Sequence, residues 1–243
     1  MPLPLPSRPN YELVLPSTGK TIKYSPFLVK EEKILLLALQ SENTREITNA
    51  IKQILKGCIL TKGVKVEELP IFDIEYIFLN VRGKSVDEAL DLIITCADDG
   101  ETQVPYKLYI DQIEVQKNPE HSKNIDFGNG VILGMKYPSL DQFIQNNFDV
   151  KMQDDVSNID KSFELVSSCI EVVYNNEESW AAKDCTKKEL IDFIEGLTTK
   201  QFKEIEKFFA TMPILSHTIT VRNPKTKEDN IIKLEGLSDF FTK

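Results

Sequence analysis

The segment from Leu69 to Val86, LPIFDIEYIFLNVRGKSV, constrains the fold of this chain more than any other part of the sequence. Apolar residues recur in it at the i, i+3, i+4 and i+7 spacing of one α-helical face: Ile74, Ile77, Phe78 and Val81. Further large apolar residues widen that surface, so we predict a helix that is buried on most sides: Phe72, Tyr76 and Leu79. We expect Gly83 to end the helix and a strand to follow from Ser85 to Thr95.

A helix buried on most sides needs other elements to cover it, and the preceding residues predict three of them. Tyr11–Leu15 and Lys20–Tyr24 are expected to be strands of a hairpin, because Gly19 between them can adopt the positive φ of a tight turn. Residues 27–40 and 44–55 have helical periodicity. In the first of these helices, we expect a broad apolar face made of Leu28, Ile34, Leu35, Ala38 and Leu39.

The rest of the chain predicts a β-rich module and then mainly helices. A hairpin turning at Asp98-Asp99-Gly100 is expected to continue into a strand at Gln103–Tyr109, with short strands at 112–116 and 131–137. After Pro138, helices are expected at 140–147, at 159–174, from a T-x-x-E capping box at Thr186 to Glu195, and from Thr199 to before Pro213. A last hairpin is expected from strands at 219–222 and 230–234.

Together these elements predict an α+β fold: a helical body with an N-terminal hairpin, a central β-rich insertion at about 84–137 and a C-terminal hairpin. We expect two regions, an N-terminal α+β region over 1–137 and a mainly helical region over 138–243, with a seam near Pro138. At 243 residues, the chain is long enough for one large domain or two small ones.

The sequence contains no constellation that predicts an enzyme, a cofactor or a metal site. The four cysteines form no C-x-x-C pair, and the two histidines, His121 and His217, are far from any of them in sequence. The net charge of −9 and the pI of about 4.9 disfavour nucleic acid as a partner, because an acidic surface repels phosphates. The N-terminus lacks a signal peptide pattern and no apolar run could span a membrane, so we expect a cytosolic protein.

What remains are features that suit protein–protein contact. Residues 1–10 form a proline-rich arm in which Leu3 and Leu5 could contact a partner, lie along the protein's own surface, or belong to a frayed terminus. Trp180 could anchor on the core or on a partner. Phe240 and Phe241, in the closing GLSDFFTK, must either fold back or meet another chain. We expect removal of 1–10 or of 238–243 to weaken partner binding without unfolding the chain.

Three segments of the sequence resemble a family of baseplate hub and hub assembly proteins from T-even type bacteriophages: LPSRPNYELVLPSTGKTIKYSPFLVKEEKILLLAL, LPIFDIEYIFLNVRGKSV and GLSDFF. The resemblance implies a non-enzymatic, chaperone-like role in building the central hub of the tail, through binding to other baseplate hub or tail proteins. It equally allows a permanent structural subunit of the hub. It implies a location in the host bacterial cytoplasm during assembly, or in the tail baseplate of the virion.

Overall fold

The computed structural model describes residues 7–41, 43–142 and 157–241, and the fold is α+β, as the sequence predicts. The chain divides into two compact units: one consists of Met1–Gln116 and Ile214–Lys243, and the other of Lys117–Pro213. Strand β5 (Glu114–Gln116) pairs antiparallel with β10 (Ile214–Arg222), and Gln116 lies directly opposite Ile214. The second unit is therefore inserted between two paired strands of the first.

This division differs from the predicted seam near Pro138, which lies inside the second unit. The reason is strand pairing that the sequence pattern does not reveal. Strand β7 (Ile132–Met135), just before Pro138, pairs with β8 (Ile170–Tyr174), more than thirty residues later in the chain. Pro138 therefore lies in a connection between paired strands of one sheet.

The first unit begins with the hairpin β1 (Tyr11–Val14) and β2 (Thr21–Tyr24), followed by helices α1 (Val29–Gln40) and α2 (Thr44–Cys58) and the short helix η1 (Val66–Glu68). Helix α3 (Ile71–Ser85) comes next and is buried on most sides, which confirms the prediction from its apolar pattern. It runs two residues beyond Gly83. The prediction that Gly83 ends the helix is therefore wrong. Ile110 packs closely against Gly83, where a Cβ would be 2.9 Å from Cδ1 of Ile110.

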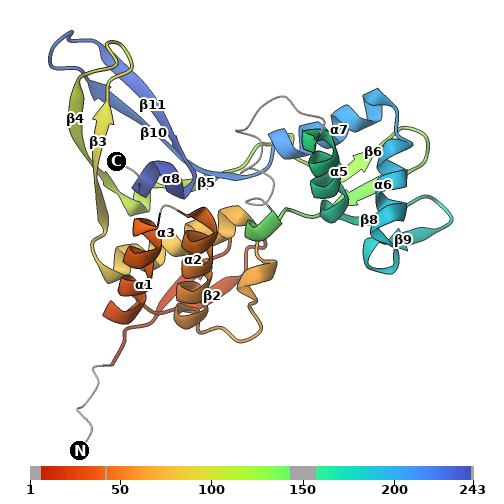
Figure 1. The fold of residues 1–243 in the computed structure, drawn as a ribbon, viewed down its shortest axis with the longest axis horizontal. Helices are drawn as coiled ribbons and strands as arrows, with labels where there is room; N and C mark the ends of the chain where they lie inside the picture. Colours follow the sequence, from red (N-terminus) through yellow and green to blue (C-terminus); the bar gives the residue numbers. More distant parts are fainter. Residues whose placement is uncertain (1–6, 42, 143–156, 242–243) are drawn as a thin grey trace, which may run out of the picture. The chain divides into compact units, whose positions relative to one another are not determined.

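Two hairpins complete the first unit. Strands β3 (Ala89–Thr95) and β4 (Gln103–Tyr109) form one, and β10 and β11 (Asp229–Glu235) form the other, with β5 extending the second into a sheet. Figure 1 shows the two hairpins side by side. The short helix η2 (Ile110–Gln112) follows β4 and leads into β5, and helix α8 (Gly236–Phe241) follows β11.

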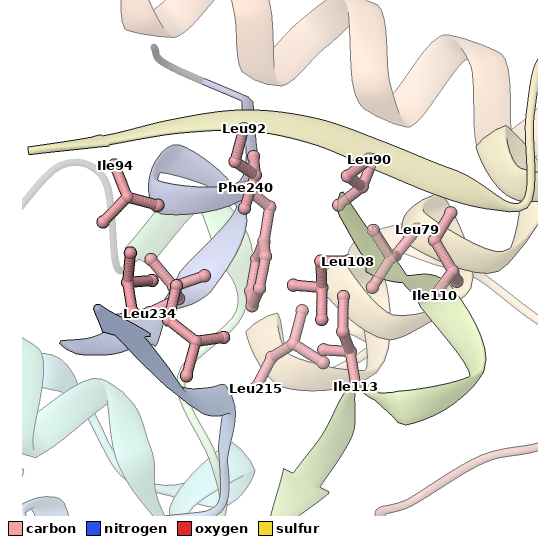
Figure 2. Close-up of a cluster of buried hydrophobic side chains, with 12 residues drawn as sticks. Leu79, Leu90, Leu92, Ile94, Leu108, Ile110, Ile113, Leu215, Leu234 and Phe240 are labelled. Atoms are coloured by element: carbon pink, nitrogen blue, oxygen red, sulfur yellow. The ribbon is translucent and has the colours of Figure 1, made fainter. Parts of the chain in front are cut away.

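The core of this part of the unit is a cluster of buried aliphatic side chains from both hairpins and from α3, with Phe240 of α8 among them (Figure 2). Leu90, Leu92, Ile94 and Leu108 come from the first hairpin, while Leu215 and Leu234 come from the second. The alternation of buried and exposed residues along each strand directs one face of each hairpin toward this cluster.

The second unit is built on a sheet in the order β6-β7-β8-β9, with β6 at Asn124–Asp126 and β9 at Ser179–Ala181. The helices of this unit that lie wholly within the described residues include α5 (Ser157–Cys169), the short η3 (Ala182–Asp184), α6 (Lys187–Glu195) and α7 (Thr199–Ala210). The capping box that opens α6 is confirmed: Thr186 Oγ1 accepts from the Glu189 N–H, and a Glu189 carboxylate oxygen accepts from the Thr186 N–H.

The predicted single helix over 159–174 is wrong. Helix α5 ends at Cys169, and Ile170–Tyr174 forms β8, the strand that pairs with both β7 and β9. The residues of β8 are rich in β-branched and aromatic side chains, which fit a half-buried sheet. Of the predicted helix at 140–147, residues 143–147 lie outside the described part of the chain.

Candidate protein-binding surfaces

Among the described residues, no three His, Cys, Asp or Glu side chains are grouped in a way that could hold a metal ion. In the same part of the chain, no helix has the length and apolar character needed to cross a membrane. The acidic turn between β3 and β4 has a structural task instead. Asp98 accepts hydrogen bonds from Asn223 Nδ2, at 2.9 Å, and from the Thr226 hydroxyl, which ties the tips of the two hairpins together. These bonds lower the pKa of the Asp98 carboxyl.

Helix α1 exposes apolar side chains along its outer surface. Four of them are between 41% and 80% exposed: Val29, Leu36, Leu37 and Leu39. Val29 and Leu36 are seven residues apart, so they lie on one line along the helix, two turns from each other. Leu37 and Leu39 lie on opposite sides of that line. We call these four residues the α1 face.

The inward side of α1 is unusual because it buries a carboxylate. Glu31 and Ala38 are the residues of this helix that are buried. Burial acts to raise the pKa of the Glu31 carboxyl, but a hydrogen bond from the Leu28 N–H at 2.8 Å and the nearby Lys30 ammonium outweigh it, and the pKa is lowered. Glu31 and Ala38, seven residues apart, mark the inward side of the helix.

The apolar face expected from the sequence is only partly buried: Ala38 is buried, whereas Leu28 and Leu39 are exposed. The sequence ILLLAL at 34–39 has six consecutive apolar residues, and six residues cover more than one full turn of a helix. Some of them must face outward, whichever side is buried. That run is the signal in the sequence from which the α1 face could have been predicted. Contiguous exposed apolar side chains on a protein surface are typical of binding sites.

Trp180 lies on β9, the strand at one end of the sheet of the second unit, and is 44% exposed. It is opposite Val173 of β8, which in turn is opposite Leu133 of β7. Residues in register share a face of the sheet, so these three side chains form a row. Leu133 is fully buried and Val173 is partly buried against the core of the unit. The row thus continues the apolar face of this core as far as the exposed side chain of Trp180. We call strand β9, with Trp180, the β9 edge.

The other residues that the sequence offered as partner contacts do not join either surface. Phe240 is only 2% exposed and packs among the aliphatic side chains of the two hairpins (Figure 2). It folds back onto its own chain, so its assignment as a partner contact is wrong. Leu3 and Leu5, together with the side chain of Phe241, lie outside what the structure describes.

Comparison with known proteins identifies the family. The family described as T4 bacteriophage base plate protein matches residues 8–242, which include both units and both candidate surfaces. No curated protein matches the chain, and no solved structure matches it. The family match covers nearly the whole chain, and the chain therefore belongs to the family of T4 bacteriophage base plate proteins.

Proposed function

We propose that this base plate protein is a non-enzymatic hub assembly protein, which promotes formation of the central hub and tail by binding other tail proteins. Its place of action would be the host bacterial cytoplasm during tail assembly. Family membership supports partners among the phage baseplate proteins. The exposed apolar side chains of the α1 face and the β9 edge support a task based on protein contacts.

The observation that carries this proposal is the exposure of Trp180 at the end of a sheet. A tryptophan buries a large apolar area when it docks and loses little conformational freedom, which is why it is frequent among the residues that dominate binding energy. Within the described residues, β9 pairs only with β8, so its outer side can accept the backbone of another chain. We assign tail-protein binding to the β9 edge.

The experiment is quantitative capture of baseplate and tail proteins from phage-infected cells by the tagged full-length chain, with each captured protein identified by mass spectrometry. Trp180→Ala is expected to lose at least roughly tenfold of the captured tail protein, as replacement of a central aromatic contact does. Tyr109→Ala is the matched control, because Tyr109 is 49% exposed and lies on β4 in the other unit. Equal capture by both variants would refute the β9 edge as the binding site.

A permanent structural subunit of the hub is the second candidate, and the α1 face is the observation that favours it. Obligate interfaces are more apolar than transient ones, and four exposed aliphatic side chains on one helix suit such an interface. Mass spectrometry of purified virions separates the two functions. An assembly factor is abundant in infected cells and absent from finished particles, whereas a hub subunit is present in the particles in fixed ratio to known tail proteins.

A further inference from the structure

We propose that two copies of this chain pair through their α1 faces, with the two α1 helices side by side and parallel. The inference concerns the first unit, and it is independent of the proposal that the β9 edge of the second unit binds a tail protein. A surface that binds a second copy across a twofold axis must be complementary to itself.

The apolar part of the α1 face meets that condition. In a parallel pair, Val29 and Leu36 on the central line of one helix face Val29 and Leu36 of the second copy. Leu37 lies about 80° from Val29 around one side of the helix and Leu39 about 80° around the other, from a turn of 3.6 residues. A twofold axis parallel to the helices brings opposite sides together. Leu37 of each copy therefore meets Leu39 of the other, and all four exposed aliphatic side chains find an apolar partner.

The two charges that lie within the α1 face, between Val29 and Leu36 along the helix, obey the same symmetry. Glu32 and Lys33 are adjacent in sequence, so they differ by only about 1.5 Å in height along the helix, but they lie on opposite sides of the line through Val29 and Leu36. In the parallel pair, Glu32 of each copy faces Lys33 of the other, which makes two ion pairs. Neither residue forms an ion pair with any described residue of its own chain. An antiparallel pair centred on these residues would instead place Lys33 beside Lys33.

The charge of α1 itself does not oppose a meeting of two copies at this helix. The chain carries a net charge of −9, so two copies repel each other at long range. Within α1, Lys30 and Lys33 balance Glu31 and Glu32, and the helix has no net charge. Two acidic chains can therefore bring their α1 faces together without adding to that repulsion.

The test measures the molar mass of the purified full-length chain over a range of concentrations by sedimentation velocity and by light scattering after gel filtration. The wild-type chain is expected to form dimers, and Leu36→Glu is expected to be a monomer. Ile231→Glu is the matched control, because Ile231 is an equally apolar, 75% exposed residue on β11 and should leave the dimer intact. Far-UV circular dichroism checks that each variant is folded, which is expected since both positions are exposed.

The parallel arrangement has a sharper test in two charge variants. Glu32→Lys creates two Lys–Lys contacts in the dimer and Lys33→Glu creates two Glu–Glu contacts, so each variant alone should dimerise roughly tenfold more weakly. When the two variants are mixed in equal amounts, each altered residue meets an opposite charge on the other chain. The mixture is expected to form mixed dimers with close to wild-type affinity.

A wild-type chain that stays monomeric at all concentrations overturns the proposal. This holds even if the α1 face turns out to be needed for capture of a tail protein. Equal dimerisation of Leu36→Glu and Ile231→Glu places the dimer contact elsewhere and also overturns it. A mixture of the charge variants that remains as weak as each variant alone overturns the parallel arrangement. None of these results bears on the β9 edge, which Trp180→Ala tests in the capture experiment.

Discussion

The carboxyl group of Glu75 in α3 accepts a hydrogen bond of 3.2 Å from the backbone N–H of Leu237, a residue 162 positions later in the chain. The contact holds the first turn of α8 against α3. Gly236, which precedes Leu237, has a φ of +66° and lies so close that a Cβ there would be 3.0 Å from Glu75 Oε1. Glycine suits this position because it adopts a positive φ without steric cost and has no Cβ to meet the Glu75 carboxyl. This contact positions Phe240 one turn further along α8.

Because of the buried Glu75 carboxyl, we expect the free energy of unfolding to fall as pH rises. Glu75 as a whole residue is partly exposed, but its carboxyl group is buried. Burial raises the pKa of this carboxyl to about 7, although the hydrogen bond from the Leu237 N–H acts to lower it. An unfolded glutamate has a pKa near 4.3, so the folded chain holds the proton more tightly than the unfolded chain. The resulting stabilisation is complete below about pH 4 and is lost as pH rises to about 7.

Glu75→Gln should remove this pH dependence, because Gln keeps an acceptor oxygen for the Leu237 N–H and does not ionise. Above about pH 7, the variant is expected to be more stable than the wild-type chain by on the order of 1–3 kcal/mol. Urea unfolding of both proteins at a series of pH values measures the difference. Two stability curves that stay parallel from acid to neutral pH would show that Glu75 titrates normally.

Phe240→Ala should destabilise the first unit by roughly 3–5 kcal/mol, as expected for a large aromatic residue removed from a packed core. The side chain is 2% exposed and is surrounded by aliphatic residues of both hairpins (Figure 2). Removal of residues 238–243 should have at least the same effect, contrary to the expectation from sequence that this tail can be removed without unfolding. Chemical denaturation of both variants measures the loss, with the exposed Ile231→Ala as a control expected to change stability by less than about 0.5 kcal/mol.

Gly83→Ala should destabilise the chain by about 1 kcal/mol or more, although alanine is the better helix former. The added methyl group would lie 2.9 Å from Cδ1 of Ile110, which is buried in the core. Ile110→Val removes that Cδ1 atom, so Gly83→Ala should be less harmful in the Ile110→Val background than in the wild-type chain. A double-mutant cycle of unfolding free energies measures this coupling, and additive effects would show that the close contact does not determine the choice of glycine.

The sequence predicts elements whose pattern is complete within one segment. Helix α3 is of this kind, because its apolar residues cover most of its circumference and few environments other than a core can accept them. The boundary between α5 and β8 is different. Ile170 and Val173 continue the helical spacing of Val166, so periodicity alone extends the helix, while the pairing of β8 with β7 and β9 decides for a strand.

The candidate surfaces depend on tertiary contacts in the same way. Which of the six apolar residues at 34–39 face outward depends on how α1 packs against α2, where Glu31 lies close to Gly57. Phe240 could fold back or bind another chain until the two hairpins are seen to surround it. Trp180 stands out in the sequence, but its place at the end of a sheet depends on β9, a strand of three residues that is too short to predict from periodicity.

Thr186→Ala should destabilise the second unit by about 1 kcal/mol, because it removes the N-cap of α6. Thr186 Oγ1 accepts from the Glu189 N–H at 3.2 Å, and alanine leaves that N–H without its partner. Thr186→Ser keeps the hydroxyl and should be close to wild type. Amide hydrogen exchange gives a local measurement: protection should fall over Lys187–Glu195 in the alanine variant and stay unchanged in α3, which belongs to the other unit. Equal protection of α6 in the alanine and serine variants would show that packing alone fixes the start of this helix.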